Sequence, residues 1–220
     1  MEYLNGDFVS KSPQYPHTYQ QVYPHYFVSW SIFSNFAPTM KKLRTIEMNR
    51  LSVDEFKQAD KLPLVVVLDD VRSMDNVGSV FRTGDAFRIE AVYLCGITST
   101  PPSTEIHKTA LGAEDSVNWK YFPTAIEALE TLKSDGYEVY SIEQAHGSTK
   151  LQNFTPGANH KYAVVLGNEV KGVHQEVVDA SDGCIEIPQF GTKHSMNVSV
   201  TGGIILADRK SGSAGMPRPI

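Results

Sequence analysis

Apolar residues group along the chain into short runs that alternate with longer amphipathic segments. The run Leu64–Leu68 is continuous, which is typical of a strand buried on both faces of a parallel sheet. We predict strands at Leu64–Leu68, Ala91–Cys95, Val117–Tyr121, Tyr137–Ile142, Tyr162–Val165 and Gly183–Ile187, and helices at Glu47–Ala59, Asn76–Phe87, Thr104–Leu111, Thr124–Lys133 and Val198–Lys210. This alternation predicts an α/β protein with a mainly parallel sheet and helices on both faces.

Polar and glycine-rich segments follow three of the predicted strands. They are Asp75–Thr83, Leu166–Gly172 and Ile187–Leu206. Parallel sheets hold their ligands at the carboxyl ends of strands. The three segments therefore predict one site, although a single loop of this kind is also ordinary turn chemistry.

The third segment, IPQFGTKHSMNVSVTGGIIL, passes from a strand through a loop into the last helix. Pro188 ends the strand because it has no N–H to donate. Gly202 and Gly203 cost this helix about 1–2 kcal/mol relative to alanine. We therefore expect another part of the chain to pack closely against both glycines.

Together the three segments resemble the three motifs of the SpoU (TrmH) family of RNA ribose methyltransferases, in the SPOUT superfamily. The resemblance covers about Val65 to Leu206. It implies a C-terminal deep trefoil knot, with the loops after Val165 and Ile187 as the crossing segments. Close approaches of the backbone are then expected at Gly167, Gly172, Gly202 and Gly203.

The resemblance also implies an activity, which is transfer of a methyl group from S-adenosylmethionine to a ribose 2′-hydroxyl in structured RNA. We favour tRNA over rRNA, because small family members often act on tRNA. The positions that match the cofactor pocket of the family are Leu166, Gly167, Asn168, Glu169, Gly172, Ile187, Met196 and Val198. The family also implies a homodimer.

Arg82 and Asn76 match the polar positions of the first motif. Arginine is effectively always protonated, and a protonated side chain cannot act as a base. For Arg82, bidentate hydrogen bonding to an RNA phosphate is therefore a more conservative role than that of a base. A surface ion pair with Asp85 or Glu90 is the structural alternative. We expect Asn76 to cap its helix, and a contact with the ribose stays open.

Glu169, Ser195 and Asn197 match the polar positions of the second and third motifs, and complete the predicted catalytic set. We expect Glu169 to fix loop backbone and to orient Asn197, and Ser195 to contact the ribose or a phosphate. Helix capping alone is the alternative for the last two. Together with Arg82, the candidate RNA contacts are Lys171, Lys193 and His194, and solvated surface charges are the alternative for these last three.

Composition restricts the remaining possibilities. Charged residues make up 20% of the 220 residues and the formal net charge is −5, so any RNA site must be a local basic patch. Metal-ligand spacings are absent from the sequence, and no metal is expected. Cys95 and Cys184 are interpreted as small core residues of a reducing compartment, and we expect a cytoplasmic protein without a membrane segment.

The first 39 residues differ in composition from the rest, with ten aromatic side chains interrupted by four prolines. We interpret residues 1–39 as an extension that is disordered or foreign to the native protein, with an RNA-stacking arm as the alternative. Residues 40–210 form the predicted methyltransferase domain, and residues 211–220 a flexible tail.

Two other functions are alternatives to RNA methylation. An unrelated Rossmann enzyme requires a GxGxxG fingerprint after the first strand, and the segment Asp69–Gly78 lacks one. A non-catalytic RNA-binding or assembly protein on the same fold stays open. Two features depart from the family. Many members carry a separate RNA-recognition domain ahead of the methyltransferase domain, whereas here only about 20 residues lie between Met40 and the first predicted strand. Gln189 occupies a position that is commonly apolar.

Overall fold

The computed structural model describes residues 40–157 and 159–208. The predictions made for residues 1–39, for the tail 211–220 and for the last two residues of the C-terminal helix lie outside this part. The chain divides into two units, Met1–Asn49 and Arg50–Ile220. In the first unit, the described residues hold one 3₁₀ turn, η3 (Thr45–Met48).

The second unit is built on one sheet of seven strands in the order β3-β2-β1-β6-β4-β7-β5. Every pair of neighbouring strands is parallel. The mainly parallel sheet is therefore confirmed. The strands are β1 (Leu62–Asp69), β2 (Ile89–Cys95), β3 (Asn118–Phe122), β4 (Tyr137–Ile142), β5 (Thr149–Lys150), β6 (Lys161–Leu166) and β7 (Gly183–Glu186).

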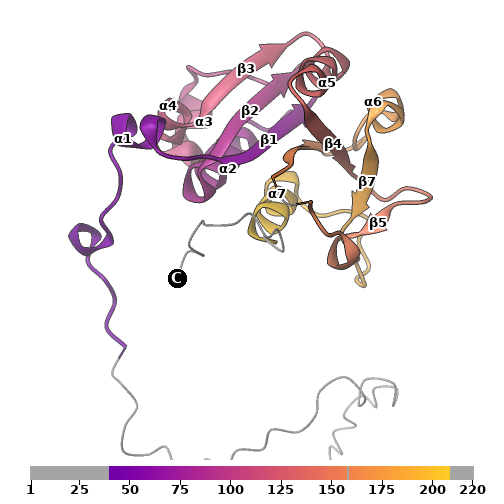
Figure 1. Cartoon of the computed structure of the whole chain (residues 1–220). Coiled ribbons are helices and arrows are strands. Elements are labelled where there is room, and N and C mark those ends of the chain that lie inside the picture. Colours follow the sequence, from indigo (N-terminus) through magenta and orange to yellow (C-terminus); the bar gives the residue numbers. More distant parts are fainter. Residues whose placement is uncertain (1–39, 158, 209–220) are drawn as a thin grey trace, which may run out of the picture. The chain divides into compact units, whose positions relative to one another are not determined.

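Helices cover both faces of this sheet, as predicted (Figure 1). Helices α2 (Met74–Phe87) and α7 (Val198–Ala207) lie together on one face, and α5 (Ala125–Ser134) and α6 (Gln175–Ala180) on the other. The short elements are α1 (Val53–Gln58), α3 (Thr104–Ala110), α4 (Ala113–Ser116) and the 3₁₀ turn η4 (Leu151–Asn153).

Strand β1 shows why two helical layers are needed. Its side chains alternate, so that Val66 and Leu68 join the core beneath α2 and α7. Val65 and Val67 join the core beneath α5 and α6. All four are at most 1% exposed, and the strand would be unstable with either layer removed.

Two helix starts differ from the prediction. The predicted helix Glu47–Ala59 is wrong over its first half, because Asn49 is left-handed (φ 46°) and α1 begins only after Ser52. Ser52 and Glu55 form a capping box there. Asn76 is not the cap of α2, because Ser73 Oγ accepts from the Asn76 N–H (3.3 Å) and takes that role.

The predicted close approach of two backbone segments is confirmed between Gly167 and Gly172, whereas Gly202 packs closely against side chains only. A Cβ on Gly167 would lie 2.1 Å from the carbonyl carbon of Gly172, and one on Gly172 would lie 2.2 Å from a carboxylate oxygen of Glu143. A Cβ on Gly202 would lie 3.1 Å from Leu166. The prediction for Gly203 is wrong within the described residues, because a Cβ there would meet nothing within 4 Å. The trefoil knot itself stays a prediction.

Both cysteines have free thiols. Burial, together with the nearby charges of Asp69 and Asp70, raises the pKa of Cys95 to about 12, and its thiol is therefore a packing group. Cys184 is only half-buried. Over the described residues, no helix has the length and apolar character needed to cross a membrane.

Candidate active site

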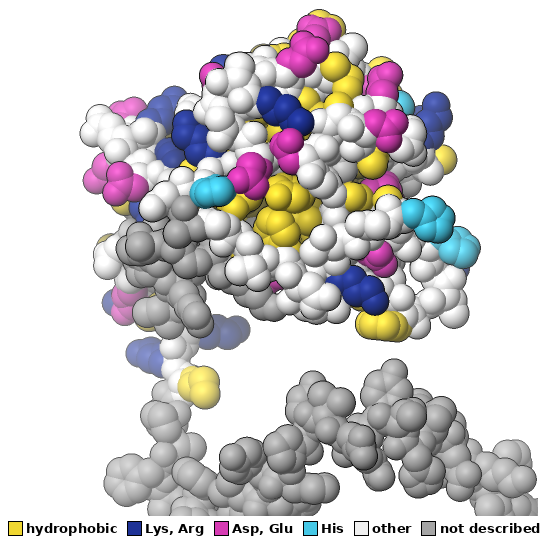
Figure 2. All heavy atoms as spheres, turned by 45° about the vertical axis from the view of Figure 1, so that its right-hand side comes forward, with side chains coloured by type: hydrophobic (Ala, Val, Ile, Leu, Met, Phe, Trp, Pro, Cys, Tyr) yellow, Lys and Arg dark blue, Asp and Glu magenta, His cyan; other side chains and the backbone are white. Residues whose placement is uncertain are grey.

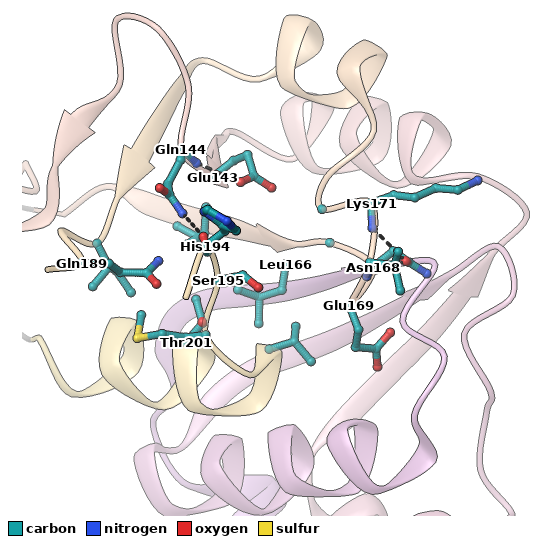
Figure 3. A pocket seen from close by; sticks show the side chains of 17 residues that line it. Glu143, Gln144, Leu166, Asn168, Glu169, Lys171, Gln189, His194, Ser195 and Thr201 are labelled. Atoms are coloured by element: carbon teal, nitrogen blue, oxygen red, sulfur yellow. Dashed lines mark hydrogen bonds between the residues drawn. The ribbon is translucent and has the colours of Figure 1, made fainter. Parts of the chain in front are cut away.

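A cavity of about 310 Å³ opens where β4, β6 and β7 end (Figure 3). The direction of winding changes between β1 and β6, next to this cavity, since the chain winds outward from β1 through β2 to β3 and then crosses to β4 on the other side of β6. Parallel sheets bind ligands at such a point. All eight residues predicted for the cofactor line this cavity: Leu166, Gly167, Asn168, Glu169, Gly172, Ile187, Met196 and Val198.

The lining has two polar sides with an apolar floor. In Figure 3, Gln144, His194 and Gln189 lie on one side, and Asn168, Glu169 and Lys171 come from the loop on the other. Leu166 and Ser195 lie between the two sides. The Gln144 side chain donates to the carbonyl oxygen of His194 (2.6 Å), which ties the third motif to the end of β4.

The loop after β6 is held in one conformation by its own backbone. Asn168 and Gly172 exchange two hydrogen bonds, from Asn168 N to the Gly172 oxygen (3.0 Å) and from Gly172 N to the Asn168 oxygen (2.8 Å). Asn168 Oδ1 accepts from the N–H groups of Val170 and Lys171, and its Nδ2 donates to the Asp70 oxygen. Asn168 therefore shapes the loop and anchors it to the end of β1.

A second anchor joins the same two segments. The His174 N–H donates to Asp69 Oδ2 (3.0 Å), and the ring Nδ1 lies 3.0 Å from both oxygens of that buried carboxylate. Hydrogen bonding to Asp69 raises the pKa of His174. Asp69, Asp70 and His174 are close enough to share an ion, but they already satisfy one another as an ion pair.

A polar relay connects all three motifs. The Asn76 Nδ2 donates to Glu169 Oε1 (3.0 Å), and the Asn197 Nδ2 donates to Asn76 Oδ1 (3.0 Å). A carboxylate only accepts, so Glu169 fixes the orientation of the first amide, which fixes that of the second. The Asn197 Oδ1 then caps α7 through the N–H groups of Ser199 and Val200. Glu169 was expected to orient Asn197, and the structure links the two through Asn76.

The Glu169 carboxylate also closes the start of α2. Its oxygens accept from the backbone N–H groups of Arg72 (3.0 Å) and Ser73 (2.9 Å). Partial burial raises the pKa of Glu169, but the hydrogen bonds from Arg72, Ser73 and Asn76 outweigh it and hold the pKa below its ordinary value. A negative charge at this helix terminus is also favoured by the helix dipole.

The remaining predicted residues are exposed. Arg82 lies on α2, about 9 Å along the helix from Asn76, and forms no ion pair with Asp85 or Glu90 in the part of the chain that is described. Ser195, Lys171 and His194 line the cavity, whereas Lys193 does not. The Lys171 side chain points away from the cavity in Figure 3.

The sequence reasoning missed Glu143 and Gln144. They follow β4 directly, and Glu143 Oε2 accepts from the Val173 N–H (3.2 Å) beside the glycine loop. Both residues could have been predicted, because they follow the predicted strand Tyr137–Ile142 and ligand sites gather at the carboxyl ends of parallel strands. The other cavity residues that were not predicted are Ile142, Val170 and Thr201.

Solved structures with a similar fold are known. A TrmH/SpoU tRNA modifying enzyme from A. aeolicus has a TM-score of 0.61 and 25% sequence identity, over 70% of this chain and 77% of that one. An AdoMet-bound rRNA methyltransferase from Sinorhizobium meliloti has a TM-score of 0.62 and 24% identity, over 69% of this chain and 57% of that one. The second comparison shows the fold alone.

Sequence relatives lead to the same family. A tRNA (guanosine(18)-2'-O)-methyltransferase of Borreliella burgdorferi is 31% identical over 143 residues, which are 65% of this chain and 64% of the relative. A 23S rRNA (guanosine-2'-O-)-methyltransferase of Neisseria meningitidis is 29% identical over 71% of this chain and 62% of its own length. The chain thus spans less than two thirds of both relatives. The model of the SpoU rRNA Methylase family matches residues 63–207, about two thirds of the sequence, and the chain belongs to this family.

Proposed function

We propose that this protein transfers a methyl group from S-adenosylmethionine to a ribose 2′-hydroxyl of structured RNA. The observation that carries the proposal is that the second and third motifs line one cavity, and that the relay of Glu169, Asn76 and Asn197 ties the first motif to them. The two relatives are named as guanosine 2′-O-methyltransferases, one of tRNA and the other of 23S rRNA. We favour tRNA, because the more similar of these two relatives is named for tRNA.

The cavity has the composition that the cofactor requires. Leu166, Ile187 and Val198 offer apolar contacts for an adenine ring, and the loop from Gly167 to Gly172 offers backbone groups for its polar edge. The bound cofactor supplies a methyl group already activated on a sulfonium, so the protein needs to place and deprotonate the hydroxyl. Gly167 leaves no space for a side chain, which keeps the loop backbone available.

The residues of the protein then have separate roles. Arg82 is exposed on α2 and is proposed to grip an RNA phosphate with its planar guanidinium. Glu169, Asn76 and Asn197 position α2 and α7 relative to each other, and Ser195 contacts the ribose from the cavity wall. Lys171, Lys193 and His194 are proposed as further phosphate contacts.

We also propose a homodimer that uses α7. This helix is apolar on its outer side as well as its inner side, since Val200 is 53% exposed and Gly203 faces open space. On the face shown in Figure 2, hydrophobic side chains gather in a central patch bordered by acidic and histidine side chains. Light scattering that finds a stable, active monomer would contradict this proposal.

The remaining proposals concern organisation and location. Residues 40–210 are proposed to be the methyltransferase domain of a cytoplasmic protein, with residues 1–39 dispensable. A chain that begins at Met40 should methylate RNA normally. A large loss of RNA affinity in that chain would instead favour the aromatic arm.

The proposed activity is tested with total RNA from a strain that lacks the gene. Purified protein and labelled S-adenosylmethionine should label this RNA, and mapping of ribose methylation should show one position lost from tRNA in the deletion strain. Labelling of rRNA alone would show that the substrate is rRNA and not tRNA. If RNA is bound but never labelled, the protein is a non-catalytic RNA-binding member of the family.

A further inference from the structure

Phe190 has an unusual environment for a phenylalanine. Its side chain is 93% exposed, and it is the most exposed aromatic residue among those that the structure describes. The other phenylalanines of the described part are buried or half-buried. A fully hydrated phenyl ring contributes nothing to the stability of the fold, so the fold does not explain this residue.

The position of Phe190 connects it to the candidate active site. It lies in the loop between β7 and α7, next to Gln189, which lines the cavity. On the loop after β6, Val170 also lines the cavity and is 79% exposed. Gln189 and the Asn168–Lys171 loop lie on opposite sides of the cavity in Figure 3. Both loops that shape the cavity therefore present an apolar side chain to solvent.

The size of the cavity restricts where the substrate can lie. A volume of about 310 Å³ is at the small end of ligand pockets, which span about 300–1,000 Å³. One small molecule therefore fills it. The nucleotide that accepts the methyl group must approach from the mouth, and its base must lie against the surface of the surrounding loops.

We propose that Phe190 is a stacking platform for the base of the nucleotide that is methylated. This inference rests on the proposed function. Unpaired RNA bases are recognised by stacking on aromatic side chains, and every base has a face that can stack. The exposed Lys193 and His194 follow within four residues and supply local donors for the adjoining phosphate. Stacking also compensates for a formal net charge of −5, which gives RNA little general attraction.

Three substitutions of Phe190 in the full chain separate stacking from other roles. Phe190→Ala should weaken binding of total tRNA by about 5- to 150-fold, the range that stacking of one base supplies. Phe190→Trp should restore binding, whereas Phe190→Leu should not, because leucine keeps apolar area but loses the aromatic face. Tyr121→Ala removes another exposed aromatic side chain, on the edge strand β3, and should leave binding unchanged.

The measurements are RNA affinity at fixed salt, affinity for S-adenosylmethionine by calorimetry, molecular mass by light scattering, and methyl transfer. Cofactor affinity and mass should not change in any variant. Full binding by Phe190→Ala or by Phe190→Leu overturns the inference, and a change of mass in Phe190→Ala shows that the ring is a subunit contact instead. Wild-type protein that binds RNA through Phe190 without methylating it refutes the proposed function and leaves Phe190 as a stacking contact for RNA only. Wild-type protein that binds no RNA overturns both.

Discussion

Replacement of Glu169 by glutamine tests whether its carboxylate holds the three motifs together. The carboxylate accepts from three donors, with Oε1 serving Ser73 N and Asn76 Nδ2 and Oε2 serving Arg72 N. A glutamine has the same shape but only one oxygen. If that oxygen keeps the two donors at Oε1, the amide nitrogen faces the Arg72 N–H at about 3 Å. Glu169→Gln therefore places two donors against each other.

The size of this effect follows from the bonds involved. A hydrogen bond to a charged group contributes about 1.5–3 kcal/mol, and a buried donor without a partner costs about 1–3 kcal/mol. Arg72 is exposed, so water replaces the lost acceptor and the smaller values apply. We expect Glu169→Gln to lower the free energy of unfolding by about 1–2 kcal/mol at pH 7. Denaturant titration followed by circular dichroism measures it.

The pH dependence provides the sharper test. The folded-state pKa of Glu169 lies below its unfolded value, so the ionised carboxylate stabilises the fold above the unfolded pKa of about 4.3. That stabilisation is lost as the pH falls through the lowered folded-state pKa. Glutamine does not titrate, so the difference in unfolding free energy between wild type and variant should shrink toward pH 3.

A matched control is Glu130→Gln, which changes an exposed carboxylate on α5. It should change the free energy of unfolding by less than about 0.5 kcal/mol at every pH. The reasoning fails if the two variants behave alike, or if the deficit of Glu169→Gln at pH 7 persists unchanged to pH 3.

Three further predictions concern the cavity, the proposed role of Arg82 and the proposed dimer. Gly167→Ala places a Cβ 2.1 Å from backbone atoms of the same loop and should push its two ends apart. The affinity for S-adenosylmethionine, measured by calorimetry, should then fall by about 5- to 150-fold. An unchanged affinity would show that this loop is not part of the cofactor site. Arg82→Ala should lower turnover at least about a hundredfold and leave cofactor affinity unchanged. Arg82→Lys should not restore turnover, because lysine lacks the planar guanidinium that binds phosphate through two N–H groups. Wild-type rates in both variants would make Arg82 a structural surface residue. Val200→Glu puts a charge on the exposed side of α7 and should yield monomers by light scattering, whereas a dimer of unchanged stability would place the interface elsewhere.

The strands were predictable because their apolar runs are long enough to be unambiguous. Six of the seven strands occur where the runs predicted them, with ends that differ by at most two residues. The missing strand is β5 (Thr149–Lys150), which has two exposed polar residues and therefore no apolar signal. Helix α6 was also missed, since only Val177 of its six residues is buried. Elements that bury so little leave little pattern in the sequence.

The site was predictable by two separate routes. The rule that ligands gather at the carboxyl ends of parallel strands predicted the region from the pattern alone. The individual cofactor positions came from the family resemblance, and the structure brings all eight to one cavity. Glu143 was missed because it belongs to none of the three motifs. Its contact with the Val173 N–H joins segments 30 residues apart, which local patterns do not record.

Asn76 shows how a local pattern misleads where tertiary contacts compete with it. An asparagine at the start of an amphipathic segment is a good cap candidate, and so is a serine three residues earlier. Capping by Ser73 leaves the Asn76 side chain free for Glu169 and Asn197, which lie 93 and 121 residues further along the chain. The wrong assignment therefore occurs where the three motifs meet. Sequence rules are expected to fail at such sites, because function there requires a side chain for contacts that its neighbours in the chain do not specify.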